Sequence, residues 1–288
     1  MELFAQQVVN SVMLGSTYAL IAVGITLIYG VLDIAHVAIM QVGVIGALTM
    51  TTVIGWVGNY WIALAVCVVV ATVVGMGSGL LVFRPLANDP PVNAFIAGFG
   101  LLVFLEAVGL LLWGPDPIRV PAAITGVGEI FGVRVVLHGL VVAVVANALL
   151  AALAVFLRRS RLGLGMRALA QDRYSAALMG ISRPRIELLT MAVASAFAGL
   201  AAGLLAPTTF VQPAIGLLLV VKAFAIVVVG GMGSIKGALI AAYLLGFTES
   251  LGAVYGSPAL VDFYALGMLL LVLVVRPRGF FGRLEEVR

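Results

Sequence analysis

The stretch VVNSVMLGSTYALIAVGITLIY, residues 8–29, decides the fold class. It contains no charged side chain, and a helix of this length crosses the roughly 30 Å hydrocarbon core of a bilayer. Eight more apolar runs follow it along the chain. The sequence therefore predicts an all-α, polytopic membrane helical bundle. The nine runs cover residues 8–29, 38–55, 61–82, 92–113, 135–157, 187–206, 217–232, 238–255 and 262–275.

The composition points to the same class. Of the 288 residues, 63% are hydrophobic and only 10% are charged, and the mean hydropathy is +1.23. Soluble domains carry about a quarter charged residues, so a soluble enzyme, a disordered chain and a disulfide scaffold are excluded. A transmembrane barrel is also excluded, because its strands would alternate apolar and polar residues.

Basic residues set the orientation of the bundle, because they gather in cytoplasmic loops. Seven arginines fall within 158–187, and four more follow the last apolar run. We therefore expect both regions, and with them the C-terminus, to face the cytoplasm. Alternation of the spans then places thirteen of the sixteen basic residues inside.

The stretch 31–55 is the most polar of the apolar runs. If it crosses the membrane, the chain has nine transmembrane helices and its N-terminus lies outside. If it only re-enters, there are eight and the N-terminus lies inside. We favour nine. The loop 114–134 is the longest external segment but is too short for a domain, so residues 1–288 are expected to form one transmembrane domain.

The segment 158–187 is the only long cytoplasmic connection between spans. Residues 166–170 indicate one short helical piece. Asp172 is placed to cap a second, which runs to Met179 and ends at Gly180. A helix of one to two turns is marginal by itself in water. Its apolar residues are therefore expected to pack into the groove of a partner. The alternative is that 158–187 is a basic loop that rests on anionic lipid headgroups.

Motifs for catalysis are missing from the sequence. It contains no G-x-x-x-x-G-K-S/T loop for nucleotide phosphates, no H-E-x-x-H or C-x-x-C motif for a metal, and no G-x-S-x-G nucleophile elbow. We therefore expect no enzyme activity, no catalytic residue, no metal site and no cofactor in this chain. The arginines flank membrane spans without an aromatic platform, which excludes a nucleic-acid site.

Four stretches resemble a known family. They are GITLIYGVL at 24–32, QDRYSAALMGI at 171–181, KAF leading to GGMGSIKGA at 222–238, and RPRGFFG at 276–282. Their order and spacing are similar to those of ABC importer permeases of the branched-chain amino acid (high-affinity leucine-isoleucine-valine) type. After Leu32 that family usually reads Asn-Phe-Ala-His-Gly, whereas this chain has Asp33 and keeps the Ala-His pair.

The resemblance implies an inner-membrane permease subunit that imports branched-chain amino acids, or a related small polar solute, by ATP-driven alternating access. It implies three kinds of partner: a second homologous permease chain, two cytoplasmic ATPases that bind the ATP, and an external solute-binding protein. It also implies that 158–187 couples the permease to the ATPases. The residues that would do so are Arg167, Asp172, Arg173, Ala176, Ala177, Leu178, Met179 and Gly180.

Ionisable residues within apolar runs are costly in lipid and are candidates for function. Five are candidates for the translocation path or its gate: Asp33, His36, Glu106, Lys222 and Glu249. We expect Lys222 and Glu249 to approach each other near the outer face. The structural alternatives are that Lys222 extends to the interface, that the acids pair with neighbouring helices, and that His36 is satisfied at a helix end.

A second class of function is a self-sufficient, ion-coupled secondary transporter or channel. Such a protein needs no partner chain, and its intramembrane acids set a pH or sodium dependence. An importer subunit is inert alone, and a bulky charged residue at Ala177 or Gly180 should abolish its transport. The sequence leaves the solute open, and also whether the second permease is a different chain or another copy.

Overall fold

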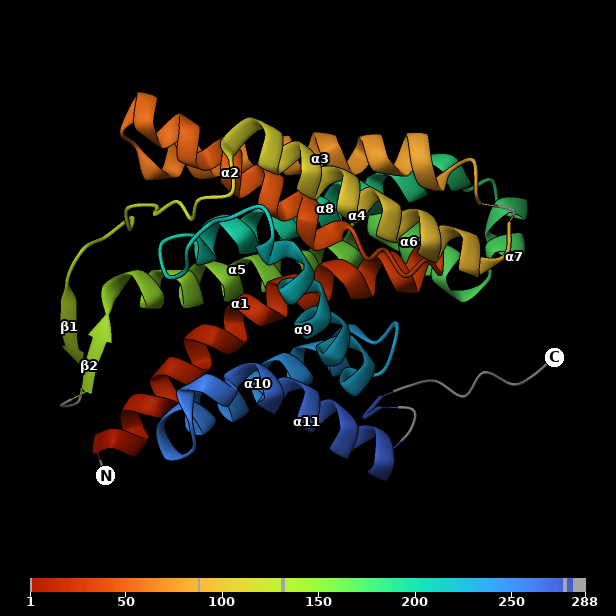
Figure 1. Ribbon diagram of the computed structural model, residues 1–288. Helices are drawn as coiled ribbons and strands as arrows, with labels where there is room; N and C mark the ends of the chain where they lie inside the picture. Colours follow the sequence, from red (N-terminus) through yellow and green to blue (C-terminus); the bar gives the residue numbers. More distant parts are fainter. Residues whose placement is uncertain (1, 88, 131–132, 277–278, 282–288) are drawn as a thin grey trace.

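The computed structural model describes residues 2–87, 89–130, 133–276 and 279–281. All nine apolar runs fold as helices (Figure 1). Seven of these helices are long and apolar enough to cross a membrane, and α9 and α11 are shorter apolar helices. The nine are α1 (Glu2–Leu32), α2 (Ile39–Val57), α3 (Tyr60–Ser78), α4 (Pro91–Trp113), α5 (Leu137–Arg159), α8 (Arg183–Leu205), α9 (Ile215–Gly230), α10 (Ile235–Tyr255) and α11 (Val261–Val275).

Helix α1 forms the centre of the bundle. It is 31 residues long and 83% of its most apolar part is buried, as expected for a helix that is apolar on every side. Helices α5, α8, α9 and α10 pack directly on it. Helices α2 and α3 pack with α8 on the other side of the molecule, and α4 lies outside α2. The predicted all-α bundle is confirmed.

Small residues allow α3 and α8 to approach closely. A Cβ atom at Gly75 would lie 1.8 Å from Ser195 Oγ, and one at Gly199 would lie 2.6 Å from Ala71 Cβ. Lipid offers no hydrophobic drive for helix association, so such close contacts supply the dispersion energy that holds membrane helices together.

The helices run between two ends of the molecule. Figure 1 shows α6 (Arg161–Gln171), α7 (Arg173–Leu178) and the α9–α10 turn at one end, and the N-terminus of α1 at the other. Most of the polar stretch 31–55 folds as α2, a continuous helix of 19 residues that is one of the seven long apolar helices. By length and composition α2 can therefore cross a membrane, as the favoured count of nine spans requires.

The loop 114–134 contains an element that the sequence analysis did not predict. Strands β1 (Val127–Ile130) and β2 (Val133–Val136) pair antiparallel, with Val127 opposite Val136. The hairpin lies at the end opposite α7 (Figure 1). Its valines and isoleucine favour strand geometry over short distances, but eight residues among prolines and glycines gave no clear alternating pattern.

Candidate functional site

Helix α7 begins at Arg173 after the Asp172 cap, as the sequence predicted, and ends at Leu178, one residue before the predicted end at Met179. The Asp172 carboxylate accepts hydrogen bonds from the backbone N–H of Tyr174 and of Ser175, at 2.8 and 3.2 Å, and from the Ser175 hydroxyl at 2.5 Å. The Ser175 hydroxyl bond is the main reason that the pKa of Asp172 lies below its usual value, and the two backbone bonds add to it. Gly180 follows the helix with φ of +80°, a conformation that glycine adopts without strain.

Helix α7 lies at the edge of the molecule (Figure 1), and its outward side chains form an apolar surface. Tyr174, Leu178 and Met179 are 74%, 71% and 83% exposed, and Ala177 is exposed beside them. These four residues are the α7 patch. The expectation that Ala176 belongs to the same surface is wrong, because its side chain is only 4% exposed and packs inward. Tyr174 was missed, although its spacing of four from Leu178 places both on one helix face.

Helix α6 connects α5 to α7 and carries Arg167. It begins at the Ser160 cap, whose hydroxyl accepts a hydrogen bond from Gly163 N–H, and so is longer than the piece predicted at 166–170. Arg167 is exposed and donates a hydrogen bond to the Arg158 carbonyl at 3.3 Å. Arg173, in the first turn of α7, is half-buried.

The connection between α1 and α2 separates Asp33 from His36. Asp33 is exposed, has φ of +54°, and ends α1 by donating its N–H to the Tyr29 carbonyl. Asn and Asp both tolerate this left-handed conformation, which explains why Asp can stand where the family pattern has Asn. His36 is fully buried, with Nε2 3.4 Å from Ser78 Oγ, and burial lowers its pKa to about 3.

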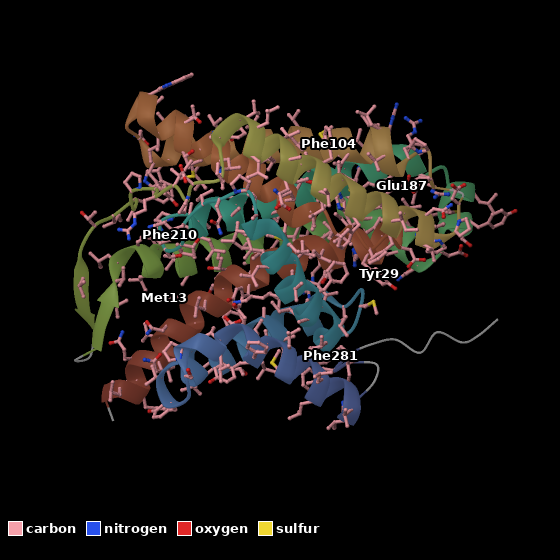
Figure 2. All side chains as sticks on the ribbon, viewed as in Figure 1. Met13, Tyr29, Phe104, Glu187, Phe210 and Phe281 are labelled. Atoms are coloured by element: carbon pink, nitrogen blue, oxygen red, sulfur yellow. The ribbon has the colours of Figure 1, made fainter. Side chains whose placement is uncertain are left out.

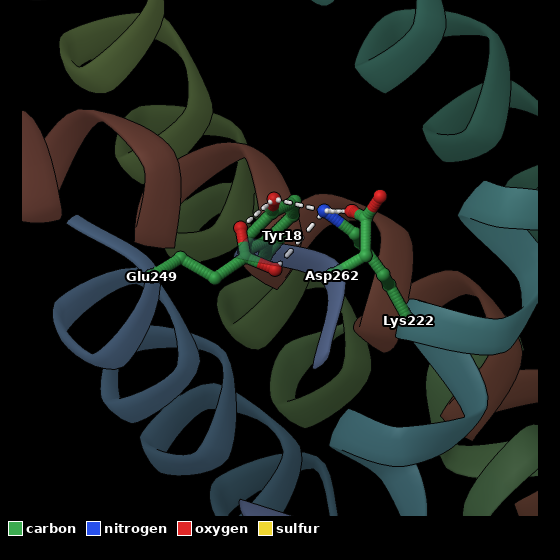
Figure 3. A network of polar contacts seen from close by, with 4 residues as sticks. All are labelled: Tyr18, Lys222, Glu249 and Asp262. Carbon is green, nitrogen blue, oxygen red and sulfur yellow. Dashed lines mark hydrogen bonds and ion pairs between the residues drawn. The ribbon is translucent and has the colours of Figure 1, made fainter. Parts of the chain in front are cut away.

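Lys222 and Glu249 meet, as the sequence predicted. Lys222 Nζ on α9 lies 3.0 Å from Glu249 Oε1 on α10 and 2.9 Å from Asp262 Oδ1 in the first turn of α11. The Tyr18 hydroxyl on α1 donates to Glu249 Oε2 at 2.5 Å, so four helices meet in one network (Figure 3). Tyr18 and Asp262 were missed, because neither contact can be read from spacing along one helix.

The network is largely removed from solvent. The Lys222 and Glu249 side chains are 12% and 3% exposed, whereas Asp262 is 57% exposed. The cation is therefore shared between one buried and one accessible carboxylate. Within the described residues, no three His, Cys, Asp or Glu side chains gather as ligands of a metal ion would.

Glu106 stands apart from this network. It is half-buried in the second half of α4 and has no hydrogen bond or ion pair with any residue that the structure describes. Phe99, Val103 and Leu110 are exposed at helical spacing around it. The structure thus brings Lys222 and Glu249 together but leaves Glu106 on a largely apolar outer face.

Three of the four resembling stretches converge at the α7 end. Phe280 N–H donates to the Val229 carbonyl at 2.8 Å and Phe281 N–H to the Gly230 carbonyl at 3.1 Å, which satisfies carbonyls at the end of α9. A Cβ at Gly30, near the end of α1, would lie 3.6 Å from Gly233 in the α9–α10 turn. Residues 277, 278 and 282–288, with three tail arginines, lie outside the described residues.

The comparison with known families decides the assignment. The family described as "Branched-chain amino acid transport system / permease component" matches residues 7–273. The chain belongs to this family. The high-affinity branched-chain amino acid transport system permease protein LivH of Escherichia coli K12 is 33% identical to this permease over 297 residues, which is 98% of this chain and 96% of LivH.

Two further likenesses extend the comparison. The high-affinity branched-chain amino acid transport system permease protein LivM of Escherichia coli K12 is 34% identical over 126 residues, covering 43% of this chain and 29% of LivM. The solved structure titled PsaBC from Streptococcus pneumoniae in complex with Fab shares the fold, with a TM-score of 0.52, 13% identity, and 96% and 93% of the two chains covered. The protein is thus a multi-pass membrane permease component, a transport subunit and not an enzyme.

Proposed function

We propose that this permease imports branched-chain amino acids, or a related small polar solute, as the transmembrane subunit of an ABC importer. Its full-length similarity to LivH, a branched-chain amino acid permease, supports the substrate class. The partial similarity to LivM supports pairing with a second, different permease chain. Residues 1–288 act as one transmembrane domain in a bacterial inner membrane, with the C-terminus and the 158–187 segment on the cytoplasmic side.

The observation that carries the proposal is the α7 patch. A helix of only six residues is held by its Asp172 cap and offers three large apolar side chains to the outside at one end of the bundle. Such an exposed apolar surface fits a groove on a partner protein, and we propose that this groove lies on the cytoplasmic ATPases. Arg167, Asp172, Arg173 and Gly180 shape or flank the patch, and buried Ala176 anchors it.

ATP-driven closure of the ATPase pair would move α7 and, with it, the helix that follows. Helix α8 starts five residues after α7 ends and packs on α1, α2 and α3, so a displacement of α7 reaches the bundle core directly. The nucleotide can shift the permease between two states only if the contact at the α7 patch differs between them. The external solute-binding protein would deliver the solute at the opposite end.

The candidate path residues take different roles in this proposal. Lys222 and Glu249 are already paired with each other, so they fit a gate that holds α9, α10 and α11 on α1 better than an open solute site. Asp33 and His36 lie in the connection at the α7 end and fit an inner gate. Glu106 has no partner within the described chain, so it is available to the second permease or to the path between the two.

Purification of the full chain from its native membrane in mild detergent tests the proposal. We expect ATPase chains to accompany it in stoichiometric amounts, and to be lost when Leu178→Glu or Met179→Glu places a charge in the α7 patch. Trp56→Glu is the matched control, since Trp56 is also 83% exposed but lies at the end of α2. A lone chain that transports in liposomes without ATP would contradict the proposal and turn attention to Glu106 and Glu249 as ion-coupling residues.

A further inference from the structure

An open cavity of about 1040 Å³ lies at the α7 end of the molecule. Its walls come from the last turns of α1, from α6 with the start of α7, and from the α9–α10 turn with Phe281. Tyr29 and Phe281, both labelled in Figure 2, line it from different parts of the chain. Of the residues assigned above, Arg167 and Arg173 of the coupling segment and Asp33 of the proposed inner gate also line this cavity.

The charges that line the cavity are mostly positive. Arg167 and Arg173 come from the α6–α7 side and Lys236 from the first turn of α10, and Asp33 is the one acidic residue in the lining. Three cations and one anion leave a formal charge of +2. In the part of the chain that the structure describes, none of the three cations forms an ion pair.

A long helix adds to this positive potential. Ser234 and Ile235 line the cavity together with Lys236, so the N-terminal turn of the 21-residue helix α10 borders it. The N-terminus of a helix carries a partial positive charge and free N–H groups, which favour an anion. Arg167, Arg173 and Lys236, together with the N-terminus of α10, therefore line the same cavity.

Much of the rest of the lining is apolar. Met232 in the α9–α10 turn and Phe281 border the same cavity and are 51% and 48% exposed. A small soluble anion would use the cations and leave this surface uncovered. An amphiphile with an anionic head and an apolar tail matches both parts of the lining.

We propose that this cavity binds an anionic phospholipid of the cytoplasmic leaflet. Its phosphate oxygens accept hydrogen bonds from Arg167, Arg173 and Lys236, and its apolar portion covers Met232 and Phe281. Helices α1 and α5 end at the cavity and α10 begins there, so the cavity lies at the level where membrane helices meet the lipid headgroups. Basic pockets between membrane helices at the headgroup level select anionic lipids, so we assign the phosphate to a membrane lipid. Such a lipid would hold α6 against the α9–α10 turn.

Lipid titration of the full chain in detergent, followed by native mass spectrometry, tests this site without any partner subunit or transport. The probes are phosphatidylglycerol, phosphatidylcholine and inorganic phosphate. We expect phosphatidylglycerol to bind preferentially, and Arg167→Gln and Lys236→Gln each to weaken it about fivefold. Arg161→Gln removes a cation from the same segment outside the cavity and is the control that should leave binding unchanged.

A variant with the opposite sign separates charge from a general loss of structure. Asp33→Asn raises the charge of the lining from +2 to +3 and suits the left-handed backbone at this position, so we expect phosphatidylglycerol to bind about fivefold more tightly. Equal binding of phosphatidylcholine, or equally tight binding of inorganic phosphate, would overturn the proposal. Occupation of the cavity by an acidic segment of the ATPase, with no lipid in the purified complex, would overturn it as well.

Discussion

Lys222 offers the sharpest test of the packing of α9, α10 and α11 against α1. Substitution by Met keeps the length of the side chain but leaves the Glu249 carboxylate, which is 3% exposed, with only the Tyr18 hydroxyl as partner. Removing one member of a buried ion pair typically costs about 3 to 5 kcal/mol, because the remaining charge has lost its compensation. We expect Lys222→Met to lower the free energy of unfolding by that amount.

The reverse substitution should be milder. In Glu249→Gln, Lys222 keeps its 2.9 Å contact with the accessible Asp262, and the amide oxygen can still accept the Tyr18 hydrogen bond. We expect a loss of about 1.5 to 3 kcal/mol, the scale of a hydrogen bond to a charged group. The double variant Lys222→Met with Glu249→Gln has no unpaired buried charge and should be more stable than Lys222→Met alone.

Reversible unfolding of the full chain in mixed micelles, followed by circular dichroism, measures these differences. Arg161→Met removes an exposed cation and is the control, for which we expect a change within about 0.5 kcal/mol. If Glu249→Gln is as damaging as Lys222→Met, or if the two losses simply add in the double variant, the shared-cation reading of this network is wrong.

Three further predictions concern other parts of the chain. Gly75→Ala should destabilise the bundle by about 1 to 3 kcal/mol, because the added Cβ has no room against α8. Gly77→Ala is the control, since open space surrounds Gly77, and thermal unfolding in detergent measures both variants. Asp172→Ala should speed amide hydrogen exchange in α7, because the helix loses its N-terminal cap. In the wild type, the same exchange should stay slow at neutral pH and speed up only as the pH falls through the lowered pKa of the Asp172 carboxyl. Buried His36 stays neutral with a pKa of about 3, whereas an unfolded histidine titrates near 6.5. The wild type should therefore lose stability as the pH falls from about 6.5 towards 3, and the His36→Phe variant should lose less stability over the same range.

The sequence was sufficient for those features that depend on local pattern. Nine apolar runs became nine helices, because lipid enforces both the length and the composition of a spanning helix. The start and end of α7 followed from Asp172 and Gly180, whose side chain and backbone act within one turn. The contact of Lys222 with Glu249 followed from the high energy of isolated charges in lipid.

Other features depend on packing between distant parts of the chain. Tyr18 and Asp262 join the Lys222 network from helices that lie more than 200 residues apart in the sequence. Which side of α7 faces outward depends on how α6 and α8 hold it, so buried Ala176 was misplaced on the outer surface. Asp33 and His36 look like one polar cluster in sequence, yet a turn of the chain leaves one exposed and the other buried.

Uptake of radiolabelled leucine into proteoliposomes tests whether this chain is the permease of an ATP-driven importer. The liposomes would contain this permease with the chains that co-purify with it, and the external solute-binding protein would be added outside. We expect uptake that requires ATP and every partner, and that is lost when Leu178→Glu disrupts the α7 patch. Uptake by this chain alone, driven by a proton or sodium gradient without ATP, would contradict it.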